Sequence, residues 1–335
     1  MPAGHDLKEG IYDQRNVSED ELWSAFSCLF SNQSKNSTSY KFGFLKAIID
    51  NLYNVDEDLN LTFDQLFSKF AEAYWNLVLK YGIRQQPVIK GKRSTALEGV
   101  LHTAVEKYSI AQGVPFESLT DEIKIYVCTN VKRKCKENVV GALYADLKGL
   151  FYSFSKSGEW IRISPYMYEF LCKHKLAVEK MNYYEWARYM EKVNDDSVLD
   201  HLLTKIEIST QRNNLAIYRR ILFEEFESKT CFYCGKLLKQ DAIHVDHFIP
   251  WSFIKDDQLW NFVLACPKCN ESKKDKLPDE MFLERIIRRN DKERLLKYTQ
   301  LFANYRSRNM RQIYVWAMAN GYQEIWRPKE RVSAQ

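Results

Sequence analysis

Two pairs of cysteines are the clearest candidates in the sequence for shared chemistry. They are Cys231 and Cys234, then Cys266 and Cys269, each in a C-x-x-C spacing, and they make up half of the eight cysteines. Four thiolates satisfy tetrahedral zinc, and each C-x-x-C turn presents two sulfurs to one ion. Because protein would fill all four positions, we expect a structural zinc site. The alternative is two unrelated pairs of thiols.

A second group of polar residues lies between and just after these pairs. Asp246 and His247 are adjacent, with His244 two residues before them. Asn261 precedes the second pair, and Asn270 follows its last cysteine. The pairs are separated by 31 residues, more than a zinc ribbon or finger usually needs. We therefore expect a folded segment between them that carries the polar residues.

The elements expected around these residues are a hairpin followed by a helix. Residues 243–249 are rich in β-branched and aromatic side chains and end at Pro250, which predicts a strand. Residues 262–265 are its expected partner, and residues 270–276 are expected to open a helix. Trp251 and Trp260 are expected to anchor the core rather than to stack on bases.

With these residues in view, the segment resembles the HNH, or His-Me finger, endonucleases, in their cysteine-containing subgroup. The resemblance rests on the phrases HVDHFIPWS, WNFVLACPKCN and SKKDKLP. It implies a ββα-metal module that hydrolyses phosphodiester bonds. A weaker resemblance to longer bacterial HNH proteins with a helical N-terminal region covers most of the chain and names no substrate.

The resemblance assigns a role to each residue of the polar group. His247 is the expected general base, because an imidazole titrates near neutral pH and can take the proton of the attacking water. Asp246 and Asn270 are expected to offer oxygen ligands to a catalytic cation, Mg²⁺ or Mn²⁺. Asn261 is expected to brace its loop by hydrogen bonds from its side chain to the backbone. For Asn270, the alternative is a helix cap.

Basic residues after the motif could contact the phosphates of a substrate. Lys273 lies three residues after Asn270 on the same expected helix face and could hold the scissile phosphate or stabilise the transition state. Further possible phosphate contacts are His244, Lys274, Arg285, Arg288 and Arg289. The alternatives are a satisfied strand histidine, ordinary solvated lysines and an exposed arginine face partly neutralised by Glu284.

The rest of the chain is predicted to be mainly helical. Ser18 and Thr62 are expected N-caps. An alternating segment that turns at Ser157-Gly158 predicts a β-hairpin at 150–163. Residues 1–20 are expected to form a polar arm and residues 83–94 a linker. Apolar residues recur at helical spacing in 19–30, 40–52, 62–82, 95–111, 117–127, 133–147, 165–175, 179–194, 196–207, 213–226, 279–297 and 299–319.

These patterns predict an α+β chain with three parts. Residues 1–227 are expected to form a mainly α N-terminal domain with a small β-hairpin, serving in targeting or regulation. Residues 228–290 are expected to form the ββα-metal HNH nuclease domain with its structural zinc. Residues 291–335 are expected to form a helical extension that packs on the nuclease domain.

Charge is distributed unevenly along the chain. The net charge is +5, yet from Lys229 to the end 20 Lys and Arg face 13 Asp and Glu, whereas the remaining 228 residues carry 29 against 31. A basic excess around the candidate site suits a polyanion such as nucleic acid, and the alternative is a basic solvated surface. No run approaches the roughly 18 apolar residues of a membrane span, and the start lacks a secretory hydrophobic region. We therefore expect a cytoplasmic protein.

The sequence thus favours a metal-dependent endonuclease that cuts DNA, with duplex DNA as the expected partner. The family implies 5′-phosphate and 3′-hydroxyl products. Analogy with bacterial relatives suggests phage defence or restriction, with a protein partner or a second copy bound through the N-terminal domain. Two alternatives stay open: a non-catalytic nucleic-acid-binding zinc protein, and an RNA-cleaving, toxin-like nuclease.

Overall fold

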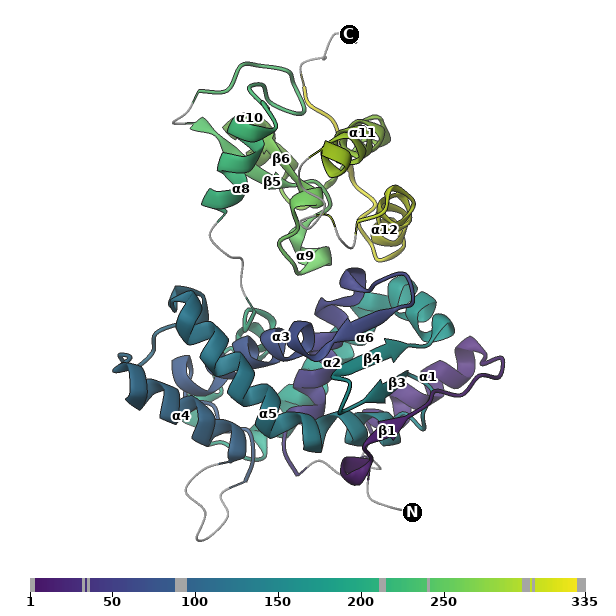
Figure 1. The fold of residues 1–335 in the computed structure, drawn as a ribbon, viewed down its shortest axis with the longest axis vertical. Coiled ribbons are helices and arrows are strands. Elements are labelled where there is room, and N and C mark those ends of the chain that lie inside the picture. The colour runs from purple at the N-terminus through teal and green to yellow at the C-terminus, as the bar shows by residue number, and fades with distance from the viewer. Residues whose placement is uncertain are drawn as a thin grey trace. The chain divides into compact units, whose positions relative to one another are not determined.

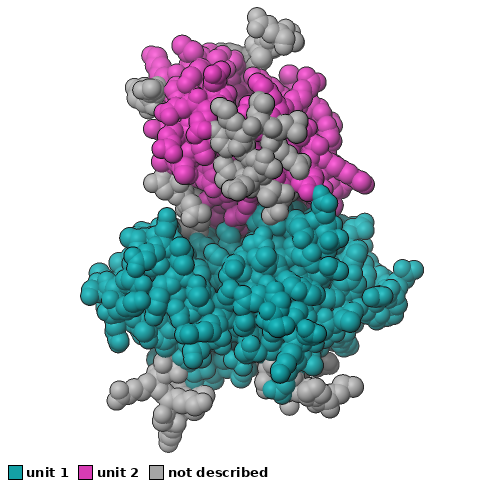
Figure 2. Space-filling view, in the orientation of Figure 1, with its two compact units in different colours: residues 1–211 teal, residues 212–335 magenta. Residues whose placement is uncertain are grey.

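The chain divides into two compact units, residues 1–211 and residues 212–335, which Figure 2 colours separately. The computed structural model describes residues 4–31, 34, 37–87, 95–210, 215–239, 242–296, 302 and 305–329. Residues 88–94 of the expected linker and residues 1–3 of the expected arm lie outside this described part.

Unit 1 is mainly helical (Figure 1). The expected N-caps are confirmed, because Ser18 and Thr62 each form a capping box with the residue three positions later. A capping box satisfies N–H groups that the first helical turn leaves unpaired, and so fixes where the helix begins. The helices are α1 (Glu19–Leu29), α2 (Tyr40–Asp50), α3 (Phe63–Trp75), α4 (Ala96–Tyr108), α5 (Asp121–Asp146), α6 (Pro165–Glu191) and α7 (Leu202–Glu207).

Two pairs of expected helices are in fact single long helices. Most of residues 117–127 and 133–147 form α5, after a 3₁₀ turn at Phe116–Ser118, and most of residues 165–175 and 179–194 form α6, which ends at Glu191. No glycine or proline lies between the two halves in either case, so the backbone has no reason to break there. In α6 the interruption is only a kink at His174, whose φ is −119°.

The expected hairpin is present and forms the centre of a larger sheet. Strands β3 (Tyr152–Ser155) and β4 (Trp160–Ile163) pair antiparallel, with Tyr152 opposite Ile163. Two short strands, β1 (Glu9–Gly10) and β2 (Asn60–Thr62), add to its edges to give the order β1-β3-β4-β2. Strands of two or three residues are too short to show an alternating pattern. For this reason β1 was not predicted within the expected polar arm.

The core of unit 1 is built around α2. Every residue of this helix except Lys41 is buried, and the helix packs against α3, α5 and α6. In a helix that is buried on all sides, a polar group is costly unless it pairs with another protein group. Lys46 does so by donating to Asp50 at 2.5 Å and to Thr210 at 2.8 Å.

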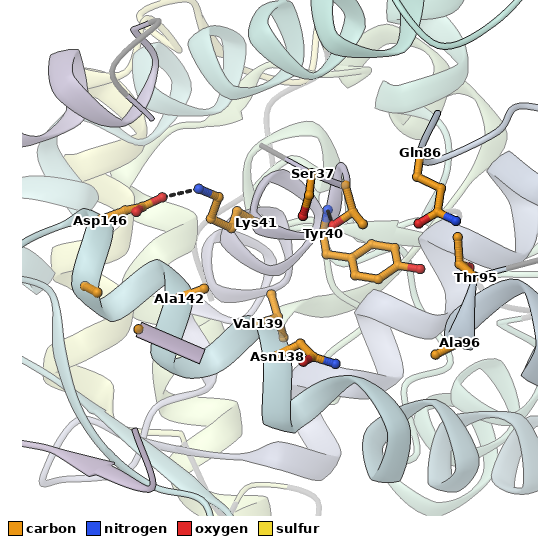
Figure 3. Close-up of a pocket in the computed structure, with 13 residues that line it drawn as sticks. Ser37, Tyr40, Lys41, Gln86, Thr95, Ala96, Asn138, Val139, Ala142 and Asp146 are labelled. Atoms are coloured by element: carbon orange, nitrogen blue, oxygen red, sulfur yellow. Dashed lines mark hydrogen bonds and ion pairs between the residues drawn. The ribbon is translucent and has the colours of Figure 1, made fainter. Parts of the chain in front are cut away.

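A cavity of about 510 Å³ lies where the N-terminal ends of α2 and α4 meet the side of α5 (Figure 3). Tyr40, Thr95 and Asn138 line it, and Lys41 forms an ion pair with Asp146 at one side. The lining mixes hydroxyl, amide and small apolar groups, so its chemistry singles out no class of ligand.

Unit 2 contains the expected hairpin and helix. Strands β5 (His244–His247) and β6 (Phe262–Ala265) pair antiparallel, with His247 opposite Phe262, and α10 (Pro267–Lys273) follows. Helix α10 begins three residues earlier than expected, because Pro267 occupies its first turn, where a missing N–H costs nothing. The other elements are α8 (Ala216–Arg220), a π-helical turn (Ile221–Glu225), α9 (Trp251–Ile254), β7 (Leu277–Pro278), α11 (Glu280–Leu296), α12 (Ser307–Ala319) and β8 (Ile325–Trp326).

The architecture is therefore α+β, with a mainly α first unit and a second unit that contains a ββα module. Trp260 is buried in unit 2, as expected of a core anchor, and Trp251 is half-buried. Within the described residues, no helix is both long and apolar enough to cross a membrane.

Candidate active site

The four cysteines meet at one point in unit 2. Their sulfur atoms all lie within 4.8 Å of one another, and Cys234 Sγ is 3.8 Å from Cys266 Sγ. Four sulfurs placed tetrahedrally around zinc at the usual 2.3 Å would be about 3.8 Å apart. The thiol positions therefore fit a structural zinc ion, with no open position for chemistry.

Local structure explains why the sulfurs converge. In the first pair, Gly235 adopts a φ of +74° and donates its N–H to Cys231 O at 2.9 Å, which closes a tight turn. In the second pair, Cys266 is the N-cap residue of α10 and Cys269 lies in its first turn. Zinc would thus join the turn at the start of the module to the helix at its end.

Asp246 lies in a buried network beside this zinc site. Tyr233, from between the first two cysteines, donates its hydroxyl to Asp246 Oδ2 at 2.5 Å. Burial, reinforced by the negative charge of Asp246, raises the pKa of Tyr233 well above its usual 10, so the phenol stays a proton donor. The pair ties the carboxylate to the cysteine turn, and no local pattern in the sequence predicts this contact.

Lys273 completes the network from α10. Its ammonium lies 3.2 Å from the Asp246 carboxylate and donates to the backbone oxygen of His247 at 2.8 Å. The lysine is 0% exposed. In this arrangement it neutralises Asp246 and holds β5 against α10, and its predicted phosphate contact stays a prediction.

Asn270 and His244 face each other at the same place. Asn270 Nδ2 is 3.0 Å from His244 Nδ1. His244 and Asp246 are two positions apart on β5 and therefore share a face of the strand. The structure thus gathers His244, Asp246, Asn270 and Lys273 between β5 and α10, where two of them carry oxygen atoms that suit a hard divalent cation.

His247 is held by a residue that sequence reasoning missed. Its Nε2 lies 2.9 Å from Asp257 Oδ1, and both side chains are buried. The imidazole ring packs edge-on against Phe262, with the ring centroids 4.7 Å apart. The only sequence signal for Asp257 was its place in the acidic turn between the two strands.

Asn261 braces the hairpin as expected. Its side chain donates to Ile249 O and accepts from Ile249 N, both at 2.8 Å, and its backbone oxygen accepts from Phe248 N at 2.7 Å. The residue is completely buried. An amide that offers both a donor and an acceptor can close this loop as a backbone strand partner would, which is a positioning role.

The remaining predicted phosphate contacts lie around α10 and α11. Lys274 is exposed at the end of α10, and Arg288 is exposed on α11. Arg285 is also exposed and donates to Phe232 O at 2.7 Å. Arg289 donates to Phe262 O at 2.6 Å and to Asn290, and burial lowers its pKa to about 10. Arg289 is therefore engaged in holding α11 against β6.

Unit 2 thus contains a ββα module with a four-cysteine zinc site. Acid, imidazole and amide groups lie on its first strand and its helix. This is the arrangement of the ββα-metal nuclease class. Residues 231–279 match the family model described as HNH endonuclease. The match begins at the first cysteine and ends just after β7, so the HNH family assignment covers this module of unit 2. No curated protein and no solved structure matches the chain.

Proposed function

We propose that the protein is a metal-dependent endonuclease that hydrolyses DNA, preferably duplex DNA. The observation that carries this proposal is the HNH family match over a hairpin and helix that carry Asp246, His247 and Asn270. The net charge of unit 2 supports it, since the segment from Lys229 onward has seven more basic than acidic residues.

The proposed reaction is in-line attack of water on a backbone phosphorus. His247 takes the proton of the attacking water as its oxygen bonds to phosphorus. The bond from phosphorus to the 3′ oxygen breaks, and the phosphate stays attached to the 5′ oxygen of the downstream nucleotide. The 3′ oxygen of the upstream nucleotide takes a proton from solvent. Asp246 and Asn270 would hold Mg²⁺ or Mn²⁺, which supplies positive charge for the developing and leaving oxygens.

The imidazole has an accessible nitrogen for this task. Within the described residues, His247 Nδ1 forms no hydrogen bond, and it is not a fully buried atom. The atom therefore retains contact with solvent-accessible space, although the residue as a whole is 5% exposed. A general base needs such an approach for the water whose proton it removes.

A substrate panel tests this function. The zinc-loaded protein is incubated with supercoiled plasmid, linear duplex DNA, single-stranded DNA and RNA, with Mg²⁺, with Mn²⁺ and with chelator alone. We expect cation-dependent cleavage of DNA with 5′-phosphate ends. Cleavage of RNA alone would support a toxin-like nuclease, and DNA binding without cleavage in either cation would support a non-catalytic zinc protein.

The finer proposals concern the expected N-terminal domain. We extend the proposal to defence against phage or foreign DNA, with residues 1–227 choosing the target or holding the nuclease inactive, in part through a protein partner or a second copy. Comparing phage plating on cells that carry the wild-type protein or its His247→Ala variant tests this role. Equal plating efficiencies would reject a defence function that depends on cleavage.

A further inference from the structure

The pair formed by His247 and Asp257 has a defined polarity. An ionised carboxylate accepts hydrogen bonds and donates none, so the 2.9 Å contact places the shared proton on His247 Nε2. A neutral imidazole has one protonated nitrogen, and its other nitrogen, Nδ1, then carries the lone pair. The carboxylate thereby selects the tautomer in which the accessible nitrogen is the basic one.

The fold fixes Asp257 as firmly as it fixes the histidine. Helix α9 ends at Ile254 and is capped by Lys255, whose φ of +60° lies in the left-handed region, and the Tyr218 hydroxyl donates to Asp257 O at 3.2 Å. Tyr218 also packs on Phe262, with ring centroids 4.7 Å apart, and Phe262 packs on the His247 imidazole. Asp257 is 7% exposed, so water competes little for its oxygen.

The neighbouring acid lacks this geometry. Asp256 accepts a hydrogen bond from the Gln258 side chain at 2.5 Å, and it is only half-buried. The two adjacent aspartates thus have the same chemistry but different surroundings, which makes Asp256 a matched control.

We propose that Asp257 is a positioning residue for the proposed hydrolysis. It holds the imidazole of His247 in one orientation and one tautomer, with the proton on Nε2 and the lone pair of Nδ1 directed to the attacking water. This inference rests on the proposed nuclease function, but it concerns a residue outside the HNH letters and makes a separate structural claim about the histidine.

A kinetic cycle tests the inference. Full-length, zinc-loaded Asp257→Asn should lower kcat by about 10²- to 10⁴-fold with KM nearly unchanged, because the amide can donate to Nε2 and shift the proton to Nδ1. Asp257→Glu should restore part of the rate, and Asp256→Asn should leave it unchanged. In the His247→Ala background, Asp257→Asn should have no further effect, since the two residues act as a unit.

A merely structural role predicts a different result. In that case Asp257→Asn would lower the rate to a similar degree with and without His247, or would change KM instead of kcat. Either outcome, or a wild-type kcat for a folded Asp257→Asn protein, would overturn the positioning role and leave the nuclease proposal intact.

A spectroscopic measurement separates the two proposals. Long-range ¹H–¹⁵N correlation of the wild-type protein labelled in its six histidines, at alkaline pH, reports the tautomer of each ring. The His247 signals are those lost in His247→Ala. We expect the proton on Nε2 in the wild type whether or not any substrate is cut. A proton on Nδ1 would contradict the inference directly, whereas absence of cleavage with the expected tautomer would count only against the function.

Discussion

Lys273 is a buried cation that contacts two candidate site residues, Asp246 and His247. Its ammonium is completely buried, and it donates to the Asp246 carboxylate and to the His247 backbone. Removing one partner of a buried ion pair leaves an uncompensated charge, which is far costlier than losing an exposed pair. Its neighbour Lys274 is exposed, so the two lysines make a natural comparison.

We expect Lys273→Met to destabilise unit 2 by about 3–5 kcal/mol, because Asp246 loses its cation. Lys274→Met should stay within about 0.5 kcal/mol of wild type, as exposed substitutions usually do. Both substitutions are made in unit 2, residues 212–335. Their free energies of unfolding are measured by denaturant unfolding, followed by tryptophan fluorescence, to which the buried Trp260 contributes. Equal stability of the two variants would mean that the Asp246–Lys273 pair contributes nothing.

At the scale of elements, the zinc site joins a turn to a helix. The first cysteine pair lies in the turn closed by Gly235, and the second lies at the start of α10. The hairpin between them carries the candidate catalytic residues. A small module of this kind depends on its metal, because the binding free energy of zinc is part of its folding free energy.

Cys266→Ser should therefore abolish zinc binding and remove the unfolding transition of unit 2, while the transition of unit 1 is unchanged. Cys28→Ser, a substitution of a single cysteine in unit 1, is the control and should keep about one zinc ion per chain. Metal analysis and calorimetry check both. A Cys266→Ser protein that retains zinc and both transitions would refute the four-thiolate site.

The sheet of unit 1 is anchored by a carboxylate in its central turn. Glu159 lies between β3 and β4 and pairs with Lys132 at 2.6 Å and Lys136 at 2.7 Å, both on α5. These hydrogen bonds hold the pKa of Glu159 below its usual 4.5. A lowered pKa in the folded state means that the pair stabilises unit 1 above pH 4.5 and that this contribution is lost as the pH falls through the folded-state pKa.

Glu159→Gln should accordingly lower the melting temperature of unit 1 at neutral pH by a small amount, because the side chain is partly exposed and screened. The difference from wild type should shrink on acidification and vanish when the wild-type carboxyl is protonated. Glu106→Gln on the exposed face of α4 is the control. A difference that is independent of pH would show that charge is not its cause.

The sequence predicted the elements with local signals and missed those that depend on distant partners. Helix caps at Ser18 and Thr62, the β5–β6 hairpin and the bracing role of Asn261 all follow from local residue chemistry and spacing. The edge strands β1 and β2 are too short for a periodic pattern, and their pairing with β3 and β4 is set by tertiary contacts. The His247–Asp257 contact was missed because it too is set by the folded structure and not by a local pattern.

At the scale of the whole molecule, the chain forms two units with separate cores. The compact units divide at 211/212, whereas the sequence places its domain boundary at 227/228. The intervening residues matter to unit 2: Leu222 is completely buried and Ile221 is 8% exposed. Tyr218 in the same segment packs on Phe262 and donates to Asp257.

Two fragments test where the nuclease unit begins. Residues 212–335 should fold alone, bind zinc and unfold cooperatively. Residues 228–335 should be less stable by roughly 2–5 kcal/mol or fail to fold, because burial of two large aliphatic side chains is lost. Denaturant unfolding of both fragments supplies the comparison. Equal stabilities would place the boundary at 227/228, and failure of the longer fragment would show that unit 2 needs unit 1.

The most direct measurement for the nuclease assignment is cleavage of supercoiled plasmid by the zinc-loaded wild-type protein and by His247→Ala, side by side in Mg²⁺ and in Mn²⁺. We predict nicked and linear products from the wild type, abolished by chelator, and a loss of at least about 10²-fold in the variant at unchanged zinc content. Undiminished cutting by His247→Ala would contradict the role assigned to the imidazole. A wild-type protein inert towards DNA and RNA in both cations would contradict the nuclease assignment itself.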